Sequence, residues 1–183
     1  TALDSFGGVD IIVNNAGYTW DSVIQKMTDK QFQDILDVHL VAPFRILRAA
    51  SEPIRAFAKQ EAAEGRVVMR KVVNISSIAG TGGGAGQANY SSAKMGVIGL
   101  TKALAKEWGR YNVNVNCVAF GLIQTRLTQP LTNEGASIDI AGEKIAVGIQ
   151  PGRISASMAA IPLGRAGTPE DAANSVYLFC IPE

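Results

Sequence analysis

Apolar residues along this chain fall into two kinds of pattern. Short, mostly apolar runs at residues 9–13 and 67–75 end in polar or glycine-containing turns, as strands buried on both faces do. Val113, Val115, Cys117 and Val118 mark a third strand that ends at Gly121. Between them, apolar residues recur every three or four positions after Thr28 and again over 88–108, which is the spacing of amphipathic helices. Strands and helices therefore alternate, and this alternation predicts right-handed βαβ units in a parallel sheet with helices on both faces.

Local signals mark where two of the helices begin and where one of them bends. Thr28 and Gln31 have the spacing of a capping box, so a helix is expected to start there. Pro43 lies inside this helical pattern and is expected to kink the helix or shift its hydrogen bonds. Near the end of the chain, Thr168 and Pro169 precede acidic residues, which predicts the start of a last helix.

One long stretch, residues 124–162, is polar, contains glycine and shows no periodic pattern. A connection of this length is too long to be a passive link within a compact domain. We expect it to act as a substrate loop or lid on a single domain that comprises residues 1–183.

Composition narrows the class of protein. The 183 residues carry 17 Lys and Arg against 16 Asp and Glu, so the net charge of +1 argues against a dedicated nucleic-acid-binding domain. A hydrophobic share of 47% argues against a disordered chain. The single histidine, His39, rules out a His-rich metal site. No apolar stretch approaches the ~20 residues of a membrane span, and no secretory signal pattern is present, so a cytoplasmic protein is expected.

Ligands of open parallel sheets bind where the strands end at their carboxyl side. This rule points to three segments of the chain: Asn14–Gly17, Ser76–Gly86 and Phe120–Thr125. The glycine-rich part of the second segment, residues 80–85, matches the G-x-G-x-x-A dinucleotide fingerprint. We reject that interpretation, because the next helix does not start directly on its last position and no acidic residue ends the following strand.

Tyr90 and Lys94 are the sharpest candidates for chemistry. Four residues apart on a helix, they share one face. An ammonium beside a phenol is expected to lower the pKa of that phenol, which would tune Tyr90 as a general acid or base. An ordinary pair on the helix surface is the alternative. Ser77, thirteen residues before Tyr90, could reach the same carbonyl oxygen. Ser76 competes for that role, but alternation along a strand sends the two serines to opposite sides.

Asn14-Asn15-Ala16-Gly17, Ser77 and Tyr90-x-x-x-Lys94, in this order, resemble the short-chain dehydrogenase/reductase family. Residues 86–121 and 161–179 are especially similar to its β-ketoacyl-carrier-protein reductase and hydroxyacyl dehydrogenase branch. The resemblance implies a Rossmann-like α/β fold that is incomplete here, because the matches begin just before the family's fourth strand. The first βαβαβ half and the final strand are expected to be missing. It also implies NADP or NAD as cofactor, with the segment that selects between them absent.

The resemblance also assigns roles to residues. Tyr90 would protonate the ketone oxygen, Lys94 would bind the nicotinamide ribose and lower the pKa of Tyr90, and Ser77 would polarise the substrate carbonyl. The cofactor side would comprise Asn14, Ala16, Gly17, Tyr90, Lys94, Gly121, Ile123 and Thr125.

Two positions depart from the family's pattern. Phe120-Gly121 stands where the family has Pro-Gly, which leaves the backbone less constrained. His39 stands where the family commonly has asparagine. His39 either takes over the proton-relay place of that asparagine or is a helix histidine bonded to a backbone carbonyl, and both interpretations stay open.

Three functions fit these observations. The first is a reductase of 3-oxoacyl thioesters or related ketones, which would also oxidise the matching secondary alcohol. The second is a catalytically impaired fragment without cofactor that keeps the fold core as a dimerisation module. The third is a relative that uses Tyr90 and Lys94 for epimerisation or dehydration. The family's usual contact through the two long helices, starting near Thr28 and Ala88, implies a homodimer or homotetramer.

Overall fold

A computed structural model describes residues 2–131, 137–140, 142–149 and 151–182. In chain order the elements are α1 (Ala2–Phe6), β1 (Ile11–Asn14), η1 (Ile24–Lys26), α2 (Asp29–Leu36), η2 (Asp37–Val41), α3 (Ala42–Ala63), β2 (Arg70–Ser77), α4 (Ile78–Gly82), α5 (Ala88–Trp108), η3 (Gly109–Tyr111), β3 (Val113–Phe120), η4 (Arg126–Thr128), β4 (Ser137–Ile140), β5 (Glu143–Ala146), α6 (Pro151–Ala159) and α7 (Pro169–Leu178).

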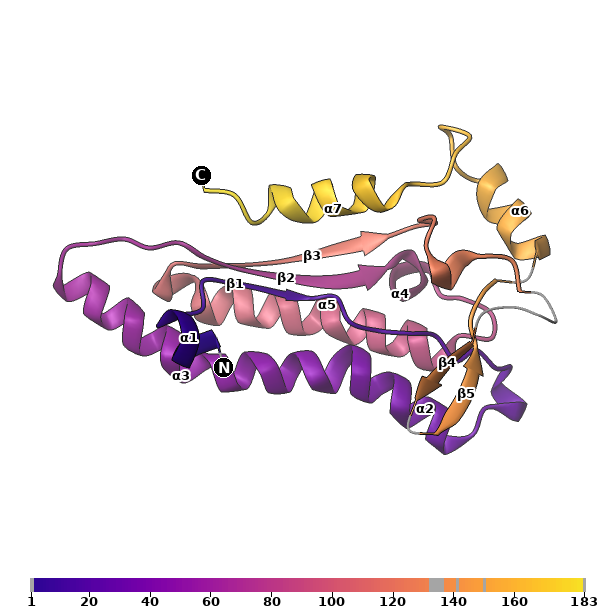
Figure 1. Cartoon of the computed structure of the whole chain (residues 1–183), viewed down its shortest axis with the longest axis horizontal. Coiled ribbons are helices and arrows are strands. Elements are labelled where there is room, and N and C mark those ends of the chain that lie inside the picture. The colour runs from indigo at the N-terminus through magenta and orange to yellow at the C-terminus, as the bar shows by residue number, and fades with distance from the viewer. Residues whose placement is uncertain (1, 132–136, 141, 150, 183) are drawn as a thin grey trace.

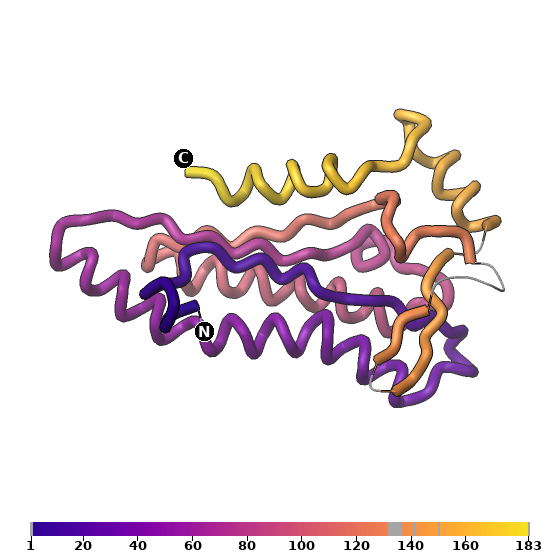
Figure 2. Tube along the Cα trace, viewed as in Figure 1, coloured from indigo at the N-terminus to yellow at the C-terminus, as the bar shows by residue number. Residues whose placement is uncertain are grey.

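Strands β1, β2 and β3 form a parallel sheet in that order. The sheet lies between α3 and α5 on one side and α7 on the other, and the strands run side by side along the molecule (Figures 1 and 2). The three strands correspond to the three apolar runs in the sequence. This arrangement confirms the predicted Rossmann-like α/β fold with part of the sheet missing.

The main core lies between the sheet and the two long helices. Leu47 and Ile54 of α3 and Trp108 of α5 pack against Val72 and Val115 of the sheet. These side chains follow the helical and strand spacing of the sequence, because each pattern turns one apolar face inward. The edge strand β1, in contrast, is only half-buried along its length.

Pro43 changes the geometry of the helix at the position where the sequence predicts a disturbance. Proline has no N–H, so the carbonyl of His39 loses the donor that an α-helix would supply. The chain widens into one π-helical turn, η2, directly before α3 begins. Such turns are frequent at functional sites, and this one contains His39. The capping box of Thr28 and Gln31 is present as predicted.

The segment 124–162 contains more structure than the sequence pattern indicates. It forms η4, an antiparallel hairpin of β4 and β5, and helix α6. Residues 132–136, 141 and 150 of this segment lie outside the described residues. The glycine-rich stretch forms the short helix α4, which ends where Gly83 adopts a φ of 79°. Gly80 lies against the Lys94 backbone, where a Cβ would come within 2.8 Å of the Lys94 carbonyl carbon.

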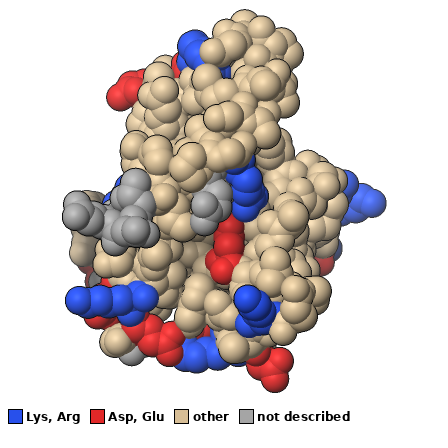
Figure 3. Space-filling view, turned by 90° about the vertical axis from the view of Figure 1, so that its right-hand side faces the viewer, with Lys and Arg blue, Asp and Glu red and all other residues tan. Residues whose placement is uncertain are grey.

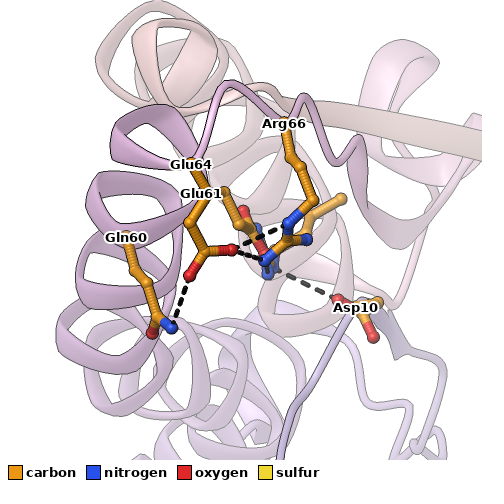
Figure 4. Close-up of polar contacts among 6 residues, drawn as sticks. Asp10, Gln60, Glu61, Glu64 and Arg66 are labelled. Carbon is orange, nitrogen blue, oxygen red and sulfur yellow. Dashed lines mark hydrogen bonds and ion pairs between the residues drawn. The ribbon is translucent and has the colours of Figure 1, made fainter.

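A group of charged residues ties α3 to the amino ends of the strands (Figure 4). Arg70, at the start of β2, donates two hydrogen bonds to the Glu61 carboxylate, at 2.8 and 2.7 Å. Its Nε lies 3.3 Å from Asp10 Oδ1, and its guanidinium stacks over the Phe57 ring. We call Asp10, Glu61 and Arg70 the amino-end cluster. In the described part of the chain, no helix is both long and apolar enough to cross a membrane.

Candidate active site

Tyr90 and Lys94 lie in the first two turns of α5 and face the interior. Lys94 is only 4% exposed, and its Nζ lies 5.5 Å from the centroid of the Tyr90 ring. The pair is therefore no ordinary surface pair. The Lys94 ammonium donates a hydrogen bond of 2.7 Å to the carbonyl of Ile75, near the carboxyl end of β2. The lysine thus joins the face of α5 that carries Tyr90 to the sheet.

The two serines at the end of β2 have separate roles, as strand alternation predicts. Ser76 is buried, and its Oγ donates to the Lys94 carbonyl at 2.7 Å. Ser77 lies on the other side, where its Oγ accepts from the Ala79 N–H and so caps α4. The Ser77 side chain also lies close enough to Tyr90 to lower the pKa of its hydroxyl. Ser77 is therefore the serine that reaches the tyrosine.

The electrostatics of Tyr90 differ from the prediction. Burial raises the pKa of Tyr90; the nearby Ser77 side chain opposes this, and the Asp21 carboxylate adds to it. The predicted lowering is wrong for this structure, because burial is the largest cause of the shift and Lys94 is not among the groups that change the pKa of Tyr90. Burial also lowers the pKa of Lys94 to about 8.

His39 projects from η2 onto the same site. Its Nε2 lies 2.7 Å from the Tyr18 carbonyl oxygen. Because a carbonyl only accepts, Nε2 must carry the proton and donate it. Burial, with a further contribution from Lys94, lowers the pKa of His39 to about 4, so the ring is neutral near pH 7. Its Nδ1 is then an acceptor, and it is buried without a hydrogen-bond partner among the described residues.

The ring of His39 is held by two contacts. It meets the Tyr90 ring edge-on, with centroids 5.1 Å apart. On its other side lies Gly17, where any Cβ would collide with the imidazole. The backbone-bonded arrangement is thus the one present, and it leaves Nδ1 available to a donor outside the described residues.

The segments predicted for the cofactor end at the same edge of the sheet. Asn14 donates from Nδ2 to Asn74 Oδ1 at 2.7 Å, and Asn74 in turn donates to Thr101. The Asn14 side chain is therefore fixed within the sheet, while Ala16 and Gly17 continue beyond it as exposed backbone. The pairing of Ser77 with Phe120 brings the end of β3 level with the end of β2.

After β3 the backbone is fixed by hydrogen bonds rather than by the missing proline. Gly121 leads into Ile123, which forms a bridge with Gly167. The Thr125 N–H donates to Thr128 Oγ1 at 2.9 Å in a capping box of η4. These contacts define the course of the chain beside the site.

The residues present fit a ribose of the kind found in a nicotinamide dinucleotide. The buried Lys94 ammonium has three N–H donors, of which one is directed to the Ile75 carbonyl. The buried His39 Nδ1 offers an acceptor. Donors and acceptors of this kind suit the hydroxyl groups of a ribose.

Sequence reasoning missed several polar residues around the site. Asn89 is fully buried and donates to the Trp20 and Gln31 carbonyls, while its Oδ1 accepts from the Tyr90 N–H. An asparagine next to Tyr90 at the start of a helix is a signal that could have found it. Asp21, Gln87 and Arg153 also meet close by. We call these three residues the carboxyl-end cluster, and nothing in their spacing marks them.

The model of the family described as short chain dehydrogenase matches residues 1–136. The chain belongs to this family. A 3-oxoacyl-[acyl-carrier-protein] reductase FabG of Vibrio cholerae is 38% identical over 180 residues, covering 98% of this chain and 62% of the relative. The Escherichia coli reductase of the same name is 37% identical over 178 residues, with coverages of 97% and 62%.

A third relative is a much longer protein than this chain. The peroxisomal hydratase-dehydrogenase-epimerase of Saccharomyces cerevisiae is 39% identical over 145 residues, which are 79% of this chain and 15% of that protein. The chain spans about three fifths of the length of the two bacterial reductases it matches.

Proposed function

We propose that the protein containing this chain is a NAD(P)-dependent oxidoreductase that reduces a ketone of the 3-oxoacyl thioester class or oxidises the matching secondary alcohol. The observation that carries the proposal is the meeting of Ser77 and Tyr90 at the carboxyl edge of the sheet, with a buried lysine beside them. Membership of the short-chain dehydrogenase family and the names of the bacterial relatives support the same reaction class.

Tyr90 would act as the general acid in the reducing direction. Its raised pKa keeps the phenol protonated near pH 7, so it holds a proton to deliver to the ketone oxygen. General acid catalysis of this kind contributes about 10²- to 10⁴-fold to the rate.

Ser77 and Lys94 would support this step in different ways. The Ser77 hydroxyl would donate to the substrate carbonyl, where negative charge develops. The Lys94 ammonium would bind the nicotinamide ribose and place a positive charge near Tyr90. Because the pKa of Lys94 is about 8, this charge is present near pH 7 and is lost as the pH rises above about 8.

The cofactor, NADP or NAD, would supply or accept the hydride. Lys94 would contact its nicotinamide ribose, the exposed backbone of Ala16 and Gly17 its adenosine-ribose side, and the segment after β3 its carboxamide and phosphate. The residues proposed to bind it are Asn14, Ala16, Gly17, Tyr90, Lys94, Gly121, Ile123 and Thr125. For Asn14 the contribution would be indirect, because its side chain bonds Asn74.

His39 is proposed as a relay residue beside Tyr90. Its neutral Nδ1 can accept a hydrogen bond from a water or ribose hydroxyl, while Nε2–H stays on the Tyr18 carbonyl. The alternative is that His39 is only a helix histidine bonded to a backbone carbonyl, that of Tyr18. Replacing it with leucine removes Nδ1, and unchanged turnover in His39→Leu would rule out the relay.

Three further features complete the proposal. Residues 124–162 would form the substrate lid of a single partial Rossmann-type domain, residues 1–183. Exposed apolar side chains on α3 and α5 support a homodimer or homotetramer through these helices; they are Phe44, Ile46 and Met95. The cytoplasmic location expected from the sequence stays a prediction.

Binding of reduced nicotinamide cofactor separates the oxidoreductase from the cofactor-free dimerisation module. The chain is titrated with NADPH and with NADH while cofactor fluorescence and the unfolding temperature are followed. We expect saturable fluorescence enhancement and a higher unfolding temperature, both weakened in Lys94→Met. Lys102→Met, which changes an exposed lysine two turns further along α5, is the matched control. No binding of either cofactor at millimolar concentration would favour the dimerisation module for this chain.

A further inference from the structure

Helix α6, residues Pro151–Ala159, lies at the end of the molecule toward which strands β2 and β3 point (Figure 1). None of its residues is buried. Only Ile154 and Met158 are partly buried, so apolar packing covers one narrow face of the helix and leaves polar contacts room to contribute to its position.

The carboxyl-end cluster supplies such contacts. Arg153, in the first turn of α6, lies with Nη1 3.5 Å from Asp21 Oδ2 and donates from Nη2 to Gln87 Oε1 at 3.3 Å. Gln87 donates from Nε2 to Asp21 Oδ2 at 2.8 Å. Each member of this triangle thus contacts both of the others. Figure 3 faces this end of the molecule and shows a basic patch directly against an acidic one in the middle of the face.

Backbone contacts fix the positions of two members of the cluster, Asp21 and Gln87. The Ser22 N–H donates to the Gly86 carbonyl at 2.9 Å, which ties the segment after Asp21 to the loop before Gln87. Gly84 leaves room for the Gln87 side chain, because a Cβ there would lie 2.5 Å from Gln87 Oε1. Asp21 and Gln87 therefore present a preformed acceptor pair to the arginine of α6.

Gln87 also lies at the start of α5, the helix that carries Tyr90. Gln87 is the N-cap residue of α5, three positions before Tyr90, and its carbonyl accepts from the Ser91 N–H at 2.7 Å. The negative charge of Asp21 also acts on Tyr90 and raises its pKa. Arg153, by pairing with Asp21, brings a compensating positive charge from α6 toward the general acid.

We propose that Arg153 is a positioning residue, which seats helix α6 over the Ser77–Tyr90 site by binding Asp21 and Gln87 and so encloses the substrate. The seating of α6 stands on the geometry alone. Its effect on substrate rests on the proposed function, and the two parts are tested by separate measurements.

The first measurement is amide hydrogen exchange of residues 151–159 in the chain without cofactor or substrate. Arg153→Met removes the guanidinium but keeps an unbranched stem, and we expect exchange in α6 to become about two- to fivefold faster, the range of an exposed ion pair. The double variant Asp21→Arg with Arg153→Asp reverses the pair and should restore slow exchange. Arg45→Met, at an exposed arginine of α3, is the matched control and should leave α6 unchanged. Unchanged exchange in Arg153→Met, or no rescue by the reversed pair, overturns the seating.

The second measurement is steady-state kinetics with an acetoacetyl thioester, on the full-length protein. A seating role predicts a higher KM in Arg153→Met with kcat within about twofold of wild type, since uniform binding is what is lost. Faster exchange in α6 with an unchanged KM overturns the enclosure of substrate and leaves the seating. If wild type itself shows no turnover, the proposed function fails, whereas the exchange result still decides the seating.

Discussion

The two ends of the parallel sheet use charged side chains differently. At the amino end, Arg70 and Glu61 form two parallel hydrogen bonds of 2.7 and 2.8 Å, and both side chains are nearly buried, at 5% and 11% exposure. At the carboxyl end, Arg153 and Asp21 lie 3.5 Å apart at 46% and 34% exposure. The first pair has two short hydrogen bonds and is shielded from solvent. The second has one long contact and is exposed to solvent.

This difference separates an ion pair that maintains the fold from one that can open and close. Breaking a buried pair leaves an uncompensated charge in the interior, so the amino-end cluster cannot open without cost to the fold. An exposed pair loses little when it opens, because water replaces the partner. The carboxyl-end cluster can therefore let a segment move near the site, while the amino-end cluster holds α3 on the sheet.

Glu61→Ala is expected to give the largest loss of stability. The change leaves the buried Arg70 with only its 3.3 Å contact to the exposed Asp10, and it should lower the free energy of unfolding by about 3 kcal/mol, the low end of the range for a broken buried pair. Glu64→Ala removes an exposed carboxylate from the same helix end, bound to Arg66, and should cost much less. Urea unfolding of both variants measures the difference. Equal losses would contradict the distinction between the two ends.

We expect the two serines at the end of β2 to differ in what their loss affects: Ser77→Ala should lower turnover, and Ser76→Ala should lower stability. Loss of the Ser77 hydroxyl should lower kcat by about 10²- to 10³-fold, as for a donor at a developing oxyanion. Loss of the buried Ser76 bond to the Lys94 carbonyl should mainly lower stability, by about 1–2 kcal/mol. Kinetics and urea unfolding of both variants, made in the full-length protein, test the assignment. The opposite pattern would place Ser76 in the site.

His39 makes the carboxyl end sensitive to acid. Its pKa is about 4 when folded and about 6.5 when unfolded, so the unfolded state binds more protons between these values. Stability is therefore full above pH 6.5 and falls by about 3 kcal/mol as the pH drops to 4. His39→Gln lacks this titration, and no other imidazole is present in the chain. Urea unfolding at pH 7 and pH 4 compares the two proteins. An equal loss of stability in both would show that folding does not lower the pKa of His39.

Much of this fold follows from local pattern, and the helix–strand alternation illustrates why. Helix α5 begins at Ala88 and ends at Trp108 as predicted, because its apolar spacing is regular over five turns. The π-helical turn before Pro43 also follows from one residue, since the N–H that proline lacks would have bonded a carbonyl only four residues earlier. The opposite sides taken by Ser76 and Ser77 follow from strand geometry alone.

The rest depends on contacts between distant segments. The hairpin of β4 and β5 and helix α6 were not foreseen. The apolar residues of the hairpin are few, and they pack against Ile35 of α2 only once the chain is folded. The carboxyl-end cluster joins residues 66 positions apart, and no periodicity encodes such a meeting. The direction of the pKa change at Tyr90 was wrong for the same reason, since the depth of burial outweighs the neighbour that sequence spacing supplies.

Turnover of an acetoacetyl thioester by Tyr90→Phe is the most direct test of the proposed site. The substitution removes only the hydroxyl and keeps the ring contact with His39, so the free energy of unfolding should stay close to that of wild type. The full-length protein should lose about 10²- to 10⁴-fold in kcat, while Tyr177→Phe, at an exposed tyrosine of α7, should retain full turnover. Turnover in Tyr90→Phe equal to that of wild type would contradict the assignment of Tyr90 as the general acid.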